Sequence, residues 1–302
     1  MKKQHKRMRG VCAAILVVAV ASLALAGSAQ AKLVEPFTKF QYCPWHNSEV
    51  SRCLYSVTNG GEVVLGSKKV PIVNPVLLQG GLSEEDEKAK TAKFFAATEG
   101  KPTLQPVAQP VPGGLAGIVN CKEIKEFLLR ISCEVFFENG FTGLNSTLEL
   151  AKPASAIKIS EANLSRKEGV ALQLPIKVHL ENPFLGSSCY VGSNSNPVIW
   201  NLTTGITSPK EPNKPIEGKA GEVTFLEEGL ILQLNNDKLV DNNWSAPGAT
   251  GCGGFPAELL LDPIINAAAG LPASAGKNTA ILKNTIEITS PFALEYIEEQ
   301  NP

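Results

Sequence analysis

The sequence predicts a mainly β protein, an antiparallel and β-sandwich-like body with one or two short helices, held by disulfide bonds. Three observations support this class. Short runs of alternating apolar and polar residues recur after residue 145, six cysteines follow a secretion-type N-terminus, and apolar residues make up 43% of the chain. Alternation with a period of two is typical of strands that bury one face. An even number of cysteines in an exported chain indicates disulfides.

Residues 1–31 are predicted to be a secretory signal peptide. Basic residues precede an apolar run from Val11 to Ala26, and Ala29-Gln30-Ala31 has the small residues that precede a Sec-type cleavage site. We therefore expect cleavage after Ala31 and an extracellular or cell-envelope location. The alternative is an uncleaved anchor, but the run is shorter than the roughly 20 residues that a membrane-spanning helix needs. No second long apolar run follows, so no membrane span is expected after the signal is removed.

The charge of the mature chain argues against nucleic acid as a partner. Removal of residues 1–31 takes away five basic residues and no acidic one, which changes the formal charge from −1 to −6. Nucleic-acid phosphates require clustered Lys and Arg, and no basic run follows Lys32.

The six cysteines of the mature chain allow 15 pairings, among which spacing alone does not choose. We favour two local loops and one long one, because this is the least tangled arrangement. The favoured bonds are Cys43–Cys53, Cys121–Cys133 and Cys189–Cys252. A zinc site is the alternative, but zinc usually needs close pairs such as C-x₂-C, and the spacings here are wider.

The chain is predicted to have a smaller β-rich part at 32–114 and a larger β domain at 115–302, with one continuous domain as the alternative. The smaller part should contain a hairpin turn at Asn59-Gly60-Gly61, because Asn-Gly between β-branched runs favours such turns. Pro71 and Pro75 indicate an edge strand or an extended loop.

A helix is expected near residues 84–98. Ser83 and Asp86 resemble a capping box, and Glu84 and Glu85 place negative charge in the first turn. The proline-rich segment 101–114 that follows should be extended, either as a linker or as a surface crossing.

In the larger part, the residues between Leu172 and Leu180 alternate as a half-buried strand does, with Lys177 and His179 on the exposed face. A second helix is expected around Asp262 and Pro263, ending at Gly270, either continuous or as two short turns. The last strand should follow Lys277, and the acidic tail after it should fray.

No motif indicates a catalytic centre, a metal site or a cofactor. The two histidines of the mature chain, His46 and His179, lack the strained serine turn of a hydrolase, and we interpret both as packing or surface residues. Ser274 to Lys277 matches S-x-x-K, but it leads into a strand instead of opening a helix. The Asn- and Asp-rich stretch 235–243 lacks a calcium loop and is predicted to be a turn. The candidate acids Asp237, Asp241 and Asp262 show no pairing by their spacing.

Three blocks of the sequence resemble a family of exported bacterial proteins with no assigned activity. They contain F-L-G-S-S-C-Y-V-G-S, G-A-T-G-C-G-G and G-L-P-A-S-A-G-K-N, and the resemblance covers mainly residues 180–285. It implies export and the Cys189–Cys252 bond, and it implies no catalytic residue. We therefore expect a secreted or envelope protein with a binding or structural role, whose partner is a cell-wall component, a lipid or another envelope protein. The alternative is a secreted hydrolase that acts on a wall or polysaccharide substrate.

Overall fold

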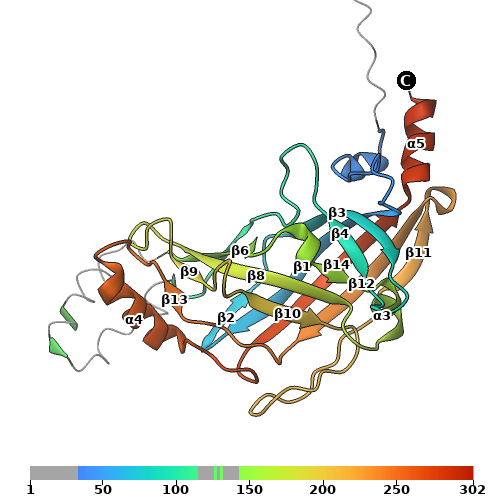
Figure 1. The fold of residues 1–302 in the computed structure, drawn as a ribbon. Coiled ribbons are helices and arrows are strands. Elements are labelled where there is room, and N and C mark those ends of the chain that lie inside the picture. The colour runs from blue at the N-terminus through green and yellow to red at the C-terminus, as the bar shows by residue number, and fades with distance from the viewer. Residues whose placement is uncertain (1–32, 115–125, 128–129, 132–142, 302) are drawn as a thin grey trace, which may run out of the picture.

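The computed structural model describes residues 33–114, 126–127, 130–131 and 143–301. Within these ranges the protein is mainly β, with a large antiparallel sheet and short helices, which confirms the predicted fold class (Figure 1). The strands in chain order are β1 (Arg52–Leu65), β2 (Lys68–Pro71), β3 (Val76–Glu85), β4 (Ala92–Phe95), β5 (Ala108–Pro110), β6 (Asn145–Leu150), β7 (Lys158–Ile159), β8 (Leu172–Glu181), β9 (Tyr190–Val191), β10 (Val198–Leu202), β11 (Glu222–Leu226), β12 (Ile231–Asp241), β13 (Ala249–Thr250) and β14 (Thr279–Thr289). The helices are η1 (Phe37–Phe40), η3 (Ala154–Ala156), α3 (Glu161–Arg166), η4 (Glu227–Gly229), α4 (Glu258–Ala269) and α5 (Pro291–Gln300).

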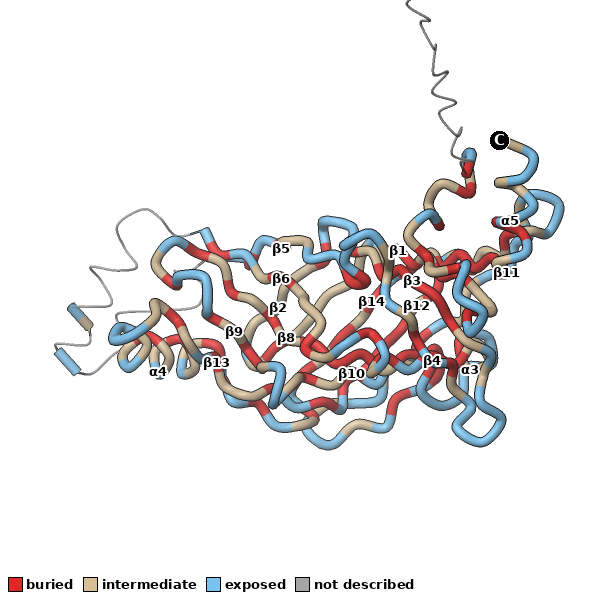
Figure 2. Tube along the Cα trace, turned by 45° about the horizontal axis from the view of Figure 1, so that its top comes forward, coloured by how far each residue is buried: buried red, intermediate tan, exposed pale blue. Residues whose placement is uncertain are grey.

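The strands form one sheet that closes on itself. Its order is β11-β12-β14-β1-β3-β4-β7-β8-β6-β5, and β10 pairs with β8. Directly after β10, Thr203 exchanges two backbone hydrogen bonds with Val240 of β12, at 3.0 and 2.9 Å. One continuous sheet therefore surrounds a single interior and forms the sandwich-like body. In Figures 1 and 2 this body is elongated, with α4 at one end and α5 and η1 at the other.

Alternation along the strands places apolar side chains inside this closed sheet. In β8, Leu174, Ile176, Val178 and Leu180 are buried, while Lys177 lies on the outer face. The inward-facing residues of the other strands join the same cluster, which runs along the whole body as the buried segments in Figure 2. The predicted half-buried strand is thus confirmed for β8.

Residues on both sides of position 114 contribute to the same sheet. β14 pairs with β1, and β4 pairs with β7, so the neighbouring strands β1, β3 and β4 from 32–114 lie between strands from 115–302. The predicted boundary at 114 therefore does not separate two sheets.

The helix predicted near 84–98 is wrong, because this segment forms the β3–β4 hairpin. The Ser83 hydroxyl accepts a hydrogen bond from the Lys93 amide across the two strands. The Asp86 carboxylate accepts from the amides of Lys88 and Ala89 and so closes the turn between them. Both side chains use their capping chemistry in a turn instead of at a helix start.

The turn predicted at Asn59-Gly60-Gly61 is also wrong. β1 continues through this position as a strand of 14 residues, with a β-bulge between Thr58 and Gly60. Gly61 has φ +115°, and a Cβ atom there would lie 1.9 Å from the Ile281 carbonyl oxygen. The glycines thus allow a bulge and a close strand approach.

Two helices lie in the C-terminal region, and only the first of them was predicted. The second helix is confirmed as the continuous helix α4, which contains Pro263 and ends at Gly270 in the left-handed conformation. The tail that we expected to fray instead forms α5, with the Ser290 hydroxyl capping the amide of Ala293 and Pro291 at its start. α5 buries Leu294 against η1 in a second apolar cluster outside the closed sheet.

Two of the three predicted disulfides are confirmed, Cys43–Cys53 and Cys189–Cys252. Cys121 and Cys133 lie outside the described residues. The first bond belongs to the outer cluster with η1 and α5, and the second joins β9 to the loop before α4.

Gly61→Ala should destabilise the protein by about 2–4 kcal/mol, because the added methyl group collides with the backbone of β14 and φ is unfavourable. Gly60→Ala is the matched control, since its Cβ would lie 4.0 Å from the nearest atom, Lys283 Cδ. It should change the free energy of unfolding by less than about 1 kcal/mol. Urea unfolding of both variants measures the difference, and equal effects would contradict the proposed close contact.

Candidate ligand-binding cavity

An apolar cavity of about 50 Å³ lies inside the closed sheet, toward the end that carries α4. Aliphatic side chains of β1, β2, β6, β8 and β9 form most of its wall, among them Val63, Val70, Leu148, Val178 and Val191. Ala269 and Leu271 close the wall from the end of α4. The cavity has room for more than one water molecule, but apolar cavities of this kind stay dry and take up apolar molecules.

A second apolar cavity, of about 30 Å³, adjoins the first along the interior. Ile72, Val76 and Leu148 line both cavities and separate them. Trp200 and Leu239 belong to the wall of the second cavity only. The interior therefore contains two neighbouring voids that share three side chains of their walls.

Polar side chains lie at the inner end of the second cavity. Ser56, Thr58 and Asn284 line it, and the Thr58 hydroxyl donates to Asn284 Oδ1 at 2.6 Å. Asn284 Nδ2 in turn lies 3.4 Å from Oδ1 of Asp237, whose side chain is fully buried. Oδ2 of Asp237 has no hydrogen-bond partner among the described residues.

Burial raises the pKa of Asp237 to about 6, and the polar contacts of Asn284 and the Gly221 backbone offset only part of this effect. An apolar surrounding disfavours the charged form of a carboxyl group. Burial also raises the pKa of Asp241, although the amides of Asn201 and Asn243 donate to its carboxylate. The stretch 235–243 does not form the predicted turn. Residues 235–241 are the second half of β12, with a bulge between Leu234 and Asp237, and residues 242–243 follow the strand.

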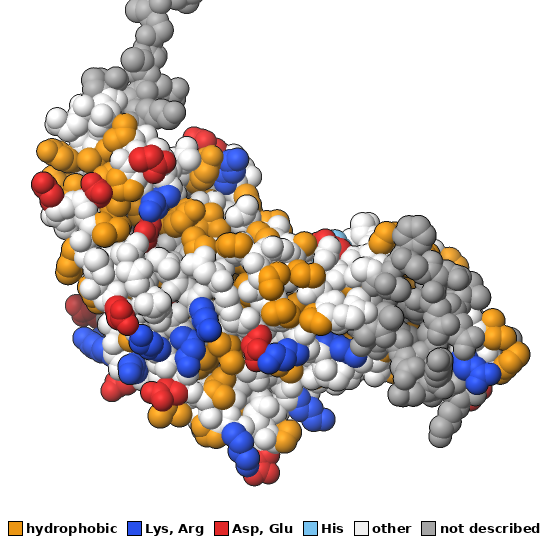
Figure 3. Space-filling view, turned by 180° about the vertical axis from the view of Figure 1, so that it is seen from behind, with side chains coloured by type: hydrophobic (Ala, Val, Ile, Leu, Met, Phe, Trp, Pro, Cys, Tyr) orange, Lys and Arg blue, Asp and Glu red, His pale blue; other side chains and the backbone are white. Residues whose placement is uncertain are grey.

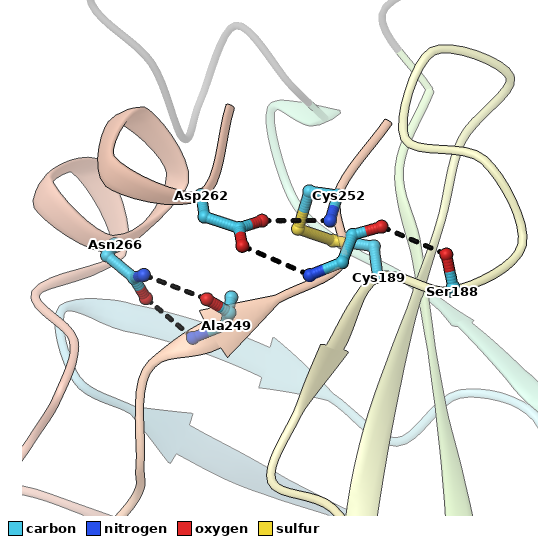
Figure 4. The surroundings of a disulfide bond; sticks show 7 residues. Ser188, Cys189, Ala249, Cys252, Asp262 and Asn266 are labelled. Carbon is cyan, nitrogen blue, oxygen red and sulfur yellow. Dashed lines mark hydrogen bonds between the residues drawn. A yellow bond between two sulfur atoms is a disulfide. The ribbon is translucent and has the colours of Figure 1, made fainter. Parts of the chain in front are cut away.

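Helix α4 is tied to the loop that precedes it (Figure 4). Asp262 accepts hydrogen bonds from the amides of Gly251 and Cys252, at 3.1 and 2.8 Å. One turn later, Asn266 accepts from the amide of Ala249 and donates to its carbonyl. Because residues i and i+4 share a helix face, the two side chains clamp this loop along one side of the helix. The Cys189–Cys252 disulfide joins the same loop to β9.

The far end of α4 rests on the turn between β1 and β2. The amide of Ser67 donates to the Ala269 carbonyl at 2.8 Å, and a Cβ atom on Gly66 would lie 2.1 Å from that oxygen. Asn278, fully buried, accepts from the amide of Gly66 and donates to the carbonyl of Trp244. The turn, the helix end and the segment before β14 thus meet at the end of the cavity.

His179 is more buried than the sequence suggested. Its side chain is only 17% exposed and stacks on Tyr190, with ring centroids 4.4 Å apart. Nδ1 lies 3.5 Å from Glu149 and 3.4 Å from Glu181. The expected position on the outer face of β8 is correct, but the strands bring it into a polar cluster. Its Nε2 has no partner within the described part of the chain.

His46 lines a separate polar groove of about 640 Å³ between the Cys43–Cys53 loop and α5. Glu99, Glu298, Thr38 and Thr98 line the same groove, which brings a histidine, acids and hydroxyls together. The ring of His46 packs on Trp45, with centroids 3.7 Å apart. Among the described residues, no acid or hydroxyl forms a hydrogen bond with His46.

The other candidate groups have structural partners. Ser274 and Lys277 belong to a turn, in which the Lys277 amide donates to the Ser274 carbonyl. Asp237, Asp241 and Asp262 each face different amides and do not pair with one another. No cluster suited to a metal ion occurs in the described ranges. No sequence pattern indicated that Asn278 and Asn266 organise the cavity end, because a single Asn has no distinctive pattern.

The surface on the rear face mixes positive and negative side chains along its lower half instead of separating them (Figure 3). No helix in the described ranges is long and apolar enough to cross a membrane. Comparisons of the chain with protein-family models, curated proteins and solved structures found no match.

Asp237→Asn should stabilise the protein at pH 7.5 by roughly 3 kcal/mol. This is the free energy that corresponds to the rise of the Asp237 pKa from 3.8 to about 6 on folding. Between these two values the folded state binds more protons than the unfolded state. Asp237 should therefore contribute a fall in wild-type stability as the pH rises from about 4 to 6, and the variant should lose this contribution, while the raised pKa of Asp241 contributes in the same direction in both proteins.

Urea unfolding at pH 4, 5, 6 and 7.5 tests this expectation. Glu295→Gln, which removes an exposed carboxylate on α5, serves as the control and should leave the wild-type profile unchanged. Equal stability of Asp237→Asn and wild type at pH 7.5 would show that the buried carboxyl group carries no such cost.

Proposed function

We propose that this chain is an exported, non-enzymatic protein that binds a hydrophobic ligand, such as the acyl chain of a lipid, inside its closed sheet. The observation that carries the proposal is the apolar cavity next to α4, with the second cavity behind it. Export is supported by the predicted signal peptide and by the two disulfides.

The shape of the interior fits a long, narrow ligand better than a compact one. The two cavities lie in a row and share one wall of three aliphatic side chains. Pockets for drug-sized ligands usually measure about 300–1,000 Å³, so a bound chain has to widen the interior. Ile72, Val76 and Leu148 are the side chains that have to move, and each chain methylene buried there contributes about 0.8 kcal/mol.

The alternative of a secreted hydrolase has weaker support. The groove at His46 contains the residue types that hydrolysis requires, but general-base catalysis needs the base within hydrogen-bond reach of its partners. His46 contacts Trp45 instead. His179 lies against two carboxylates and a tyrosine, and among the described residues no serine or cysteine forms a hydrogen bond with its ring.

Val178→Phe should lower the affinity for an apolar probe at least about ten-fold, a loss of about 1.4 kcal/mol, because the added ring fills the first cavity. The probe is N-phenyl-1-naphthylamine, which is neutral and fluoresces in apolar surroundings. Titration of the mature, oxidised protein with the probe measures the dissociation constant.

Val50→Phe is the matched control, since Val50 is buried in the outer cluster away from both cavities. Both variants overpack a core, at a typical cost of about 1–3 kcal/mol, so thermal unfolding must show that each remains folded. Wild-type protein that fails to bind the probe, or Val178→Phe that binds it as wild type does, would contradict the proposed function.

A further inference from the structure

We propose that the ligand carries a neutral hydroxyl group at one end of its chain, and that Ser56, Thr58 and Asn284 bind this group in the second cavity. This inference rests on the proposed function and adds the chemistry of the ligand. It starts from the wall of the second cavity, where these three polar side chains interrupt a lining that is otherwise formed by aliphatic residues and a tryptophan.

Ser56 brings a hydroxyl group to the second cavity without pairing it to the protein. It lies on β1 between Leu78 of β3 and Ile286 of β14, so both of its neighbours across the strands are apolar. Its side chain lines the cavity, and the residue is only 9% exposed. Within the described ranges, its hydroxyl group forms no hydrogen bond. A buried hydroxyl group without a partner is unfavourable, so a ligand oxygen beside Ser56 gains a hydrogen bond at this point.

Thr58 and Asn284 have hydrogen-bonding capacity left in the same wall. Thr58 follows Ser56 by two residues and so lies on the same face of β1, directly opposite Asn284 of β14. The Thr58 hydroxyl donates to Asn284 Oδ1 at 2.6 Å, and its oxygen accepts no hydrogen bond from the described chain. Asn284 Nδ2 lies 3.4 Å from Asp237 Oδ1 and 3.5 Å from the Leu282 carbonyl oxygen. Both distances exceed the usual range of about 2.7–3.2 Å, so this amide donor is weakly used.

A hydroxyl group matches these side chains because it both donates and accepts hydrogen bonds. It can accept from the Ser56 hydroxyl or from Asn284 Nδ2, and it can donate to the oxygen of Thr58. An ether oxygen only accepts, so it uses fewer of these groups. The remainder of the wall is apolar and suits the chain that carries the hydroxyl group.

The surroundings favour a neutral group over a charged one. No charged side chain belongs to the wall of the second cavity in the described part of the protein. A buried charge without a partner of opposite sign is strongly unfavourable. Asp237 lies behind Asn284 and is fully buried, so an anion here would also be close to a carboxyl group. A cation gains little, because Asp237 does not line the cavity and the Asn284 amide group lies between them.

Displacement of N-phenyl-1-naphthylamine from the mature, oxidised protein at pH 7.5 tests the inference. Octan-1-ol, 1-methoxyheptane and 1-chlorooctane have the same number of heavy atoms and differ in their hydrogen-bonding groups. Octanoate and octylamine add a negative and a positive charge to a similar chain. Octan-1-ol should bind most tightly, about five-fold more tightly than 1-chlorooctane, which is the effect of one neutral hydrogen bond.

Ser56→Ala should remove most of this five-fold preference and leave the affinity for 1-chlorooctane unchanged. Ser146→Ala is the matched control, since it removes a hydroxyl group from the wall of the first cavity, and it should keep the preference of wild type. Thermal unfolding without ligand gives a second measurement. Ser56→Ala should not lower the Tm, because its hydroxyl group has no partner in the described chain to lose. A lower Tm would show that the protein itself uses this hydroxyl group and would contradict the proposed site.

The outcomes separate this inference from the proposed function. If the three uncharged compounds bind wild type equally, the interior binds apolar chains and the hydroxyl site is refuted. Equal affinity for 1-methoxyheptane and octan-1-ol also refutes it, and tighter binding of octanoate or octylamine refutes the neutral group. If Ser146→Ala loses the preference and Ser56→Ala keeps it, the assignment to the second cavity is wrong. If no compound displaces the probe from folded wild type, both proposals are wrong.

Discussion

The pairing of β14 with β1 on one edge and β12 on the other is the constraint on which the rest of the structure depends. Ala280, Leu282, Ile286 and Ile288 of β14 alternate toward the interior. Because the side-chain period of a strand is two, a slip of one residue in either pairing would turn a whole row outward. The register of β14 therefore decides which face of the neighbouring strands surrounds the cavities.

The bulges in β1 and β12 lie at the same level of β14. The β1 bulge follows Thr58, and the β12 bulge precedes Asp237, and both of these residues are opposite Asn284. Bulges bend and twist a strand, so two of them beside one residue help the sheet to curve and close. Asn284 accepts from Thr58 and lies against Asp237. The polar layer inside the apolar interior thus occurs where both neighbours of β14 carry a bulge, and the buried carboxyl group of Asp237 is a cost of that arrangement.

The sequence predicted the parts of the fold in which one local signal has one structural outcome. Alternation identified β8, and the glycine at position 270 identified the end of α4. The prediction from sequence failed where one residue type suits two different local structures. Ser83 and Asp86 are good helix caps, but they are equally good turn formers, and only the pairing of β3 with β4 decides between the two. Gly61 suits a hairpin turn as well as a close strand contact, and the distant Ile281 backbone determines the choice. The cavity was not predictable either, because its wall combines residues from strands that are far apart in the sequence.

Three blocks of the sequence, residues 184–193, 248–254 and 270–278, fall at the same end of the molecule. The first contains Cys189, the second contains Cys252, and the third contains Asn278. In the structure, the disulfide, the clamp of Asp262 and Asn266, and the hydrogen bonds of Asn278 hold α4 and the β1–β2 turn together (Figure 4). Apolar contacts such as those of Leu261 and Ile265 would be enough for a helix whose sole role was to cover the core. The additional polar clamp and the covalent bond fix the position of the helix end, and with it the β1–β2 turn at the end of the cavity. A ligand-binding interior gains from such a fixed end, because a wall that is ordered before the ligand arrives reduces the conformational entropy lost on binding.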